Sequence, residues 1–216
     1  MKGVIAKDLY EFFGIRKNLM GFLSSYVFVM IQVAIGDSML LPIVVSTVFV
    51  PFLLIPSPIQ TTSMLDDKYD YPMYQITGPV TRKDVVNGKY LIGIIFMIFN
   101  NLLLTLFLLT RLHDTELKNL LLLSFISMII SLYSLAINYP SLMIFGIWGM
   151  IPMIISFAIG MIIYLVFPLS KIIKFFKGIT AVNILYVLII SVIVALGLLL
   201  ISYFVTQHFY NKKEFK

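Results

Sequence analysis

Five long intervals of the sequence contain no Asp, Glu, Lys or Arg, and they decide what the chain can fold into. They cover positions 18–36, 38–65, 90–110, 119–170 and 178–211. A helix that crosses a bilayer needs about 20 apolar residues, so four of the intervals have room for one such helix each. The 52 residues of the fourth interval are too many for one span and must contain a turn. Pro140 predicts this turn at 138–141, because proline disfavours helix at its own position and just before it.

The sequence therefore predicts an all-α polytopic membrane protein with six transmembrane helices. The expected spans are 18–35, 39–60, 90–109, 119–138, 146–168 and 180–206. Composition agrees, because 12% of the residues are charged, against about 25% in soluble domains. The absence of Cys excludes disulfides and Cys-ligated metal sites.

The distribution of Lys and Arg predicts the orientation. Eleven of the 16 basic residues lie in the N-terminal segment, in 65–89 and in the tail, and five lie on the other side. The positive-inside rule places the first group in the cytoplasm. The net charge of +6 is therefore explained by membrane topology and by attraction to anionic lipid rather than by nucleic-acid binding.

The expected layout is one transmembrane domain, 1–216. It consists of an interfacial helix (1–17), a first helical hairpin (18–64), a cytoplasmic segment (65–89), spans three to five (90–168), an external amphipathic segment (169–179), the last span (180–207) and a cytoplasmic tail (208–216).

The N-terminal segment has the pattern of an amphipathic helix. One face carries Ile5, Leu9, Phe12 and Phe13, and the other carries Lys7, Asp8 and Glu11. Lys7 and Glu11 are four residues apart, which allows a weak ion pair. Such a helix lies in the membrane interface with its apolar face against the acyl chains. A plain membrane anchor explains this pattern.

The longest polar interval gathers eight charged residues between Asp66 and Lys89. Thr81 and Asp84 have the spacing of a capping box, with Gly78 and Pro79 just before it, so we expect a helix to begin at Arg82 and continue into the third span. Upstream, four large side chains, Tyr69, Tyr71, Met73 and Tyr74, stand between charges. They fit a solvated loop at the membrane surface or the anchors of a protein interface, and the pattern leaves both open.

The sequence lacks the motifs that several energy sources and catalytic mechanisms require. Gly88-Lys89 is not the end of a phosphate-binding loop, since Lys83 stands where the loop needs glycine and Tyr90 where it needs Ser or Thr. No Asp, Glu, Lys or Arg lies inside a predicted span, which argues against proton coupling and less strongly against sodium coupling. No protease motif is present. We therefore expect a protein that is not an enzyme and takes its energy from another chain.

The polar residues inside the expected spans are amides and hydroxyls. They are Gln32, Asn100, Asn101, Ser124, Ser127, Ser131 and Ser134. The serines line one face of the fourth span, and such faces let membrane helices pack closely and hydrogen-bond. The alternative is a path-lining surface made of Asn100, Asn101, Ser127 and Ser131. Prolines at 42, 51, 56 and 58 predict kinks in the second span.

Three separated blocks resemble the small bacterial ABC-2-type permeases. They are MKGVIAKDLYEFFGIRKN, DDKYDYPMYQITGPVTRKDVVNGKYL and AINYPSLMIFG. The resemblance implies a subunit of the bacterial cell membrane that pairs with an identical or paralogous permease and sits on a separate ATP-binding subunit. This chain would bind no cofactor, because ATP and Mg²⁺ belong to the partner.

In that family the N-terminal segment is an interfacial elbow helix, which here would be 1–17. The segment between spans two and three is a coupling helix that docks on the ATPase. Carried over, the resemblance implies this role for Tyr69, Tyr71, Met73, Tyr74, Gly78, Pro79, Thr81, Arg82, Lys83 and Asp84.

The expected function is ATP-driven export of a hydrophobic or amphipathic substrate, such as a peptide toxin, an antimicrobial peptide or a lipid-like compound, with a role in antimicrobial resistance. A charged solute in an apolar path would cost several kcal/mol. Within the family, the staphylococcal permeases that export phenol-soluble modulins are the most similar in character. The alternative is a membrane immunity or sensor-accessory protein that binds a toxin or a membrane partner without transport.

Overall fold

The structure is a computed structural model that describes residues 2–35, 45–71, 80–111, 117–152, 154, 155, 158 and 181–213. Every regular element among these residues is helical. In chain order they are α1 (Lys2–Leu9), the π-helix η1 (Tyr10–Gly14), α2 (Arg16–Ile35), the π-helix η2 (Val45–Phe49), α4 (Val50–Leu54), α5 (Ser57–Lys68), α7 (Arg82–Arg111), α8 (Leu117–Phe145), the 3-10 helix η3 (Gly146–Met150) and α11 (Ala181–Lys212).

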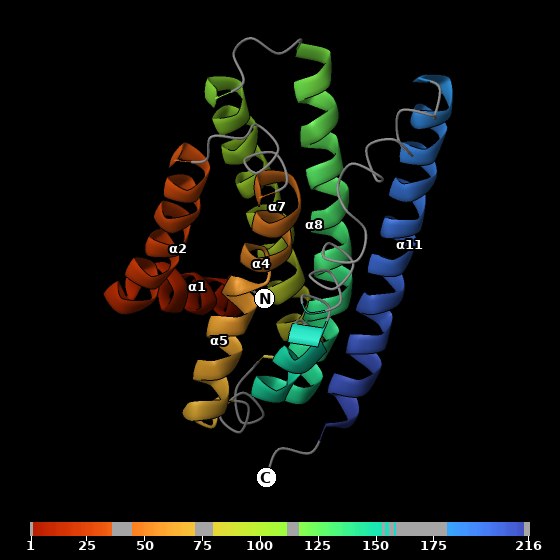
Figure 1. Ribbon diagram of the computed structural model, residues 1–216. Coiled ribbons are helices and arrows are strands. Elements are labelled where there is room, and N and C mark those ends of the chain that lie inside the picture. The colour runs from red at the N-terminus through yellow and green to blue at the C-terminus, as the bar shows by residue number, and fades with distance from the viewer. Residues whose placement is uncertain are drawn as a thin grey trace.

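The long helices α7, α8 and α11 stand side by side, and α1 lies across the bundle at the foot of α2 (Figure 1). We call the lower end of the bundle in this view the base; it holds the end of α5, the start of α7 and the ends of α8 and α11. A core cluster joins α1, α5, α7, α8 and α11 at and above the base, through buried side chains that include Val4, Ile59, Val86, Leu142 and Tyr210. The base is thus where all these helices meet.

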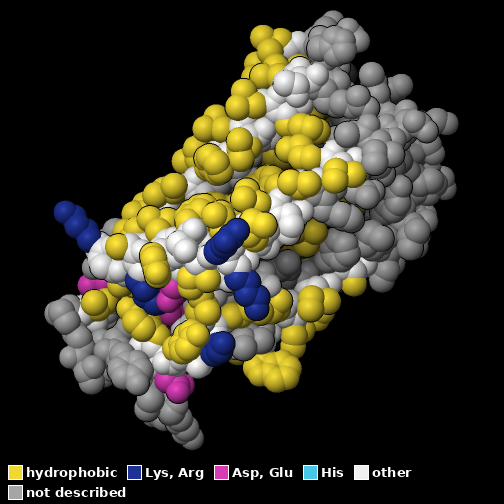
Figure 2. All heavy atoms as spheres, turned by 90° about the vertical axis from the view of Figure 1, so that its left-hand side faces the viewer, with side chains coloured by type: hydrophobic (Ala, Val, Ile, Leu, Met, Phe, Trp, Pro, Cys, Tyr) yellow, Lys and Arg dark blue, Asp and Glu magenta, His cyan; other side chains and the backbone are white. Residues whose placement is uncertain are grey.

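Four helical stretches among the described residues are long and apolar enough to cross a membrane: Thr47–Lys68, Arg82–Thr110, Asn119–Phe145 and Tyr186–Lys212. Large apolar side chains on their outer faces are exposed, as with Leu106 on α7 and Ile193 on α11. Seen from the α2 side, apolar side chains cover most of the described surface, and charged ones gather toward the lower end (Figure 2). A surface of this kind faces lipid rather than water.

The turn predicted at 138–141 is wrong, because α8 continues through Pro140 to Phe145. Asn138 and Tyr139 are fully buried in the bundle, and neighbouring helices let a membrane helix tolerate proline. The helix ends instead at Gly146, whose φ of +58° lies in the left-handed region that glycine adopts without steric cost.

The bounds of other predicted spans also change. The second candidate span ends at Lys68 rather than at 60, whereas its predicted start at 39 lies outside the described residues. It is interrupted between α4 and α5 at Ile55 and Pro56, where a proline kink was expected. The last span runs to Lys212 rather than 206. The first predicted span matches α2. Most of the fifth, and all of the segment 169–179, lie outside the described residues.

The N-terminal helix is present, but its charged face does not point to water. Asp8 is 2% exposed, whereas Leu9 and Phe13 on the apolar face are exposed. The expected ion pair between Lys7 and Glu11 forms at 3.2 Å. The N-terminal segment therefore turns Lys7 and Asp8 into the protein, and its apolar side chains are divided: Val4 and Phe12 are buried, whereas Leu9 and Phe13 face outward.

Candidate functional site

The predicted capping box at the start of α7 is confirmed. The Thr81 hydroxyl donates to Asp84 Oδ2 at 2.8 Å, and the Asp84 backbone N–H donates to Thr81 Oγ1 at 3.1 Å. These bonds satisfy donors that the first turn of a helix leaves without partners. The helix begins at Arg82, as the sequence predicted, so Thr81 and Asp84 fix the point where the chain enters α7.

Arg82 ties this entry point to the last helix. Its guanidinium donates to the backbone oxygens of Tyr210, at 3.4 Å, and Asn211. Both oxygens lie at the C-terminal end of α11, where carbonyls lack helical partners and favour a cation. Higher up, the Tyr203 hydroxyl of α11 donates to Asn87 Oδ1 of α7 at 2.6 Å. The start of α7 and the end of α11 are thus bonded together.

The other residues of the predicted coupling segment are only partly described. Tyr69 is 62% exposed just after α5, Lys83 is exposed on the first turn of α7, and Tyr71 is half-buried. Four of them, Met73, Tyr74, Gly78 and Pro79, lie outside the described residues. Their predicted contact with an ATPase stays a prediction.

Behind this segment, four charged side chains from three helices form a closed ring of alternating sign, which we call the ion ring. Lys7 of α1 binds Asp66 of α5, and Asp66 binds Lys89 of α7 at 2.8 Å. Lys89 lies 3.5 Å from Asp8 Oδ2, and Asp8 Oδ1 lies 3.3 Å from Lys7, which closes the ring. The ion ring therefore links α1, α5 and α7.

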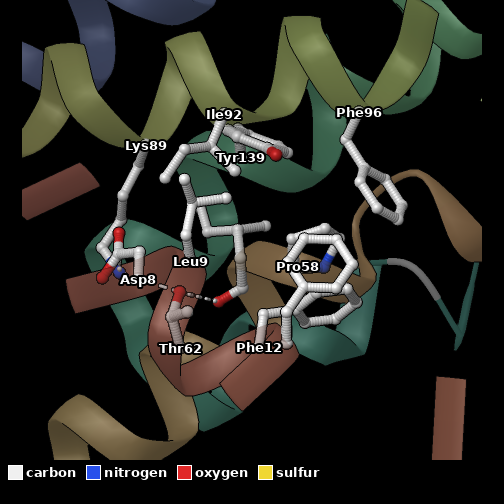
Figure 3. Close-up of a pocket in the computed structure, with 11 residues that line it drawn as sticks. Asp8, Leu9, Phe12, Pro58, Thr62, Lys89, Ile92, Phe96 and Tyr139 are labelled. Carbon is white, nitrogen blue, oxygen red and sulfur yellow. Dashed lines mark hydrogen bonds and ion pairs between the residues drawn. The ribbon is translucent and has the colours of Figure 1, made fainter. Parts of the chain in front are cut away.

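Each lysine of the ion ring makes two hydrogen bonds and has one further carboxylate oxygen within 3.5 Å, to which it is paired by charge without a hydrogen bond. Lys89, only 4% exposed, adds a bond of 2.9 Å to the hydroxyl of Thr62, and Lys7 adds the pair with Glu11. Figure 3 shows Lys89 reaching down from α7 toward Asp8 and Thr62. An ammonium group can donate three hydrogen bonds. Pairing of this kind makes burial of the charges tolerable.

The electrostatics of α1 follow from this pairing. Burial alone would lower the pKa of Lys7, but the neighbouring Asp66 and Asp8 carboxylates outweigh it and hold this pKa above its ordinary value. Burial raises the pKa of Glu11, and Lys7 offsets only part of the effect. Lys7 is therefore a firmly charged member of the ion ring, whereas Glu11 is the carboxylate that its surroundings stabilise least.

The carboxylates of Asp8, Glu11 and Asp66 also lie close enough to hold a metal ion, with ligand atoms within 4.8 Å of one another. Here the Lys7 and Lys89 ammonium groups stand among these oxygens. A metal ion would have to displace the buried Lys89 ammonium group and the partly buried Lys7 ammonium group. We therefore interpret the cluster as ion pairs.

Tyr71 connects the ion ring to the segment that follows α5. The Lys7 ammonium lies 3.8 Å from the centre of the Tyr71 ring, within the range of a cation–π contact. Tyr71 is the last described residue before 72–79. A residue of the predicted coupling segment thus contacts a residue of the ion ring directly.

The sequence prediction missed the ion ring. Asp66 and Lys89 were assigned to a polar interval, and both are instead buried inside helices with the length and composition of membrane spans. Lys7 and Asp66 are 59 positions apart, so no local pattern joins them. One signal was available: Asp66 ends one charge-free interval and Lys89 precedes the next, which puts them at the same level of two consecutive helices.

The predicted path residues lie higher in the bundle, at the contact between α7 and α8. Asn101 accepts from the Ser127 hydroxyl at 2.8 Å and donates to Ser131 Oγ at 2.9 Å. Ser127 and Ser131 are buried. These bonds are typical of packing between membrane helices, which was one of the two interpretations of the serine face. The other interpretation, that these residues line a substrate path, stays a prediction.

Asn100 faces a different neighbour. Its side-chain oxygen accepts from the hydroxyl of Tyr26 on α2, and its side-chain nitrogen has no hydrogen-bond partner among the described residues. Asn100 thus joins α2 to α7, while Asn101, the next residue, joins α7 to α8.

An apolar pocket lies beside the ion ring between α1, α5 and α7 (Figure 3). Its lining includes Leu9, Phe12, Pro58, Ile92 and Phe96. The Phe12 ring meets the Phe96 ring edge-on, with centroids 5.5 Å apart, an arrangement that aromatic pairs favour. Aromatic packing therefore supports the ion ring on the side of α2.

One comparison with known proteins gives a match. A family model described as "ABC-2 family transporter protein" matches residues 3–211. No curated protein matches the chain, and no solved structure does.

Proposed function

The chain belongs to the ABC-2 transporter family, as a multi-pass membrane component without a catalytic domain, and on this premise we propose that it is the permease subunit of an exporter driven by a separate ATP-binding subunit. The four long apolar helices and α2 fit the six-span layout expected from the sequence. Ten of the 16 basic residues lie at the base, in α1 or at the foot of α2, so we propose that this end of the bundle faces the cytoplasm. A second permease copy or a paralogue completes the transporter.

One observation carries this proposal: the predicted ATPase-contacting turn is built into the transmembrane helices. Thr81 and Asp84 cap α7, and Arg82 bonds the end of α11. A force applied to this turn therefore reaches two long apolar helices at once.

We further propose that the substrate is apolar or amphipathic, as a helical peptide or a lipid-like compound is. Among the described span residues, the buried charges Asp66 and Lys89 lie at the base and bind each other. The polar groups deeper in the bundle, such as Asn101 and Ser127, are neutral. A path near these groups offers a charged solute no opposite charge, which makes its transfer costly.

Co-purification tests the ATPase contact. We expect a variant with Tyr69→Ala, Met73→Ala and Tyr74→Ala to insert in the membrane as the parent chain does and to lose a co-expressed ATP-binding subunit. The control is Tyr186→Ala, a similarly exposed aromatic near the other end of α11. Unchanged co-purification of the triple variant would contradict the coupling role and favour a binding protein that does not transport.

A further inference from the structure

Resting on the proposed function, we propose that the ion ring transmits movement of the ATPase-contacting segment to α1 and, through α1, to α2. Lys7, Asp8, Asp66 and Lys89 are then positioning residues for transport. The proposal rests on three successive contacts: Tyr71 with Lys7, the ion ring with three helices, and η1 with the first turn of α2.

The first step is the contact between Tyr71 and Lys7. Tyr71 comes two residues after the exposed Tyr69 and directly before 72–79, so it moves with the segment that the ATPase would grip. The Lys7 ammonium lies 3.8 Å from its ring centre. This contact needs the aromatic face but not the hydroxyl, which allows a sharp choice of variants.

The second step is the ion ring itself. Its bonds are charge-assisted and mostly shielded from water, so they are stronger than exposed ion pairs. Separating one helix from the other two would leave a buried charge without its partner, which is strongly unfavourable. The ion ring therefore favours one arrangement in which α1, α5 and α7 move together. The close approach of α1 to α7 supports this. A Cβ atom added at Gly88 of α7 would lie only 3.3 Å from Val4 Cγ1 of α1.

The third step leads from α1 to α2. The chain turns sharply between them, and the corner is bonded: Asn18 Nδ2 donates to the Glu11 backbone oxygen at 2.7 Å, and Ile15 N donates to the Tyr10 oxygen at 3.2 Å. Phe12 also packs on Phe22 of α2, with ring centroids 5.1 Å apart. A displacement of α1 is thus passed to the foot of α2.

The competing explanation is that the ion ring only holds the folded chain together. A purely structural role predicts that loss of the ring lowers stability but leaves the response of α2 to nucleotide unchanged. Transmission predicts that this response is lost. The test must therefore read the position of α2 with and without nucleotide.

The chain contains no Cys, so pairs of spin labels can be placed on introduced cysteines without removing native ones. One pair, at Ala6 and Leu91, reports α1 against α7. The other, at Val27 and Leu198, reports α2 against α11. All four positions are exposed, Leu198 and Leu91 to 41% and 37%. Distances are measured in the complex with the ATP-binding subunit, before and after a non-hydrolysable ATP analogue is added.

In the parent complex we expect the analogue to shift the distance between Val27 and Leu198 and to leave the distance between Ala6 and Leu91 unchanged. Lys7→Met should abolish the shift between Val27 and Leu198 and should broaden the distribution of distances between Ala6 and Leu91. The control is Lys17→Met, which removes an exposed lysine of α2 outside the ion ring and should behave as the parent.

Tyr71 supplies a second pair of variants in case Lys7→Met does not fold. Tyr71→Phe keeps the aromatic face and should retain the shift, whereas Tyr71→Leu should lose it. Because Tyr71 also belongs to the predicted coupling segment, binding of the ATP-binding subunit is measured in both variants, and a Tyr71→Leu chain that no longer binds it would indicate docking by Tyr71 rather than transmission through Lys7. A full shift in both Lys7→Met and Tyr71→Leu would overturn the proposal. So would the absence of any shift in a parent complex that binds the analogue.

Failure of this inference and failure of the proposed function give different results. If the chain were not an ATPase-driven permease, the parent chain would not co-purify with the ATP-binding subunit. If only the inference were wrong, the parent would still co-purify, and either it would show no shift or the variants of Lys7 and Tyr71 would shift as the parent does.

Discussion

Two of the buried polar networks among the described residues are built from different chemistry. At the base the ion ring uses full charges from α1, α5 and α7. Higher up, between α7 and α8, Asn101 binds Ser127 and Ser131 with neutral groups. The difference follows the cost of burial, because an ionised side chain becomes more expensive toward the middle of a bilayer. Charge is placed at the end of the bundle, where movement would enter, and amides and hydroxyls are placed where helices must only pack.

The largest effect should come from breaking the ion ring at Asp66, which binds both lysines. Asp66→Leu leaves Lys7 and Lys89 with a missing partner in a buried site. We expect the free energy of unfolding to fall by about 3–5 kcal/mol, measured by denaturant titration in detergent micelles. Lys17→Met is the exposed control, and an Asp66→Leu variant as stable as that control would show that the ring contributes nothing.

The next largest effect tests packing between the two networks, at Gly93 of α7. An added Cβ there would overlap the Tyr139 ring of α8, so Gly93→Ala should cost about 1–3 kcal/mol through overpacking. Gly197→Ala is a matched control on α11, since nothing lies within 4 Å of an added Cβ. Equal melting temperatures for the two variants would mean that α7 and α8 are not as close as the structure has them.

A smaller effect is expected in the neutral network. Asn101→Ala removes the partner of Ser127 and Ser131 and should cost about 1–2 kcal/mol, the usual range for hydrogen bonds between membrane helices. The same denaturant titration applies. If the loss matched that of Asp66→Leu, the contrast between the two networks would not hold.

The smallest effect should come from Glu11, at the edge of the ion ring. Its pKa is raised by burial, so the neutral form is favoured in the folded chain. Stability linked to this proton is present at low pH and is lost as pH rises through the raised pKa. Glu11→Gln cannot ionise and should therefore differ from the parent by less than about 0.5 kcal/mol, and its relative stability should improve from about pH 4 to about pH 7.

The opposite trend would mean that the ionised carboxylate of Glu11 is a needed partner of Lys7. Stability curves of the parent and Glu11→Gln across this pH range decide between the two.

Local patterns predicted part of this structure well. The capping box, the start of α7 at Arg82 and the pair of Lys7 with Glu11 each depend on residues three or four positions apart. Helix geometry alone brings such residues together. The long apolar helices were equally readable, since length and hydropathy are properties of one segment.

The errors have tertiary causes. Proline at 140 predicted a turn, but α8, packed among its neighbours, stays helical past it and ends just before Gly146. The charged face of α1 was expected to contact water. Nothing in the sequence of α1 itself shows that this face contacts Asp66 of α5 and Lys89 of α7. A face of a helix can be read from periodicity; what covers that face depends on residues far away in the sequence.

The most direct test of the account is transport by the reconstituted chain. In proteoliposomes that hold the chain and its ATP-binding subunit, we expect ATP to drive accumulation of a fluorescent amphipathic helical peptide, and we expect none without the ATP-binding subunit. Peptide accumulation by the chain alone, driven by an ion gradient, would contradict the claim that its energy comes from a separate ATPase.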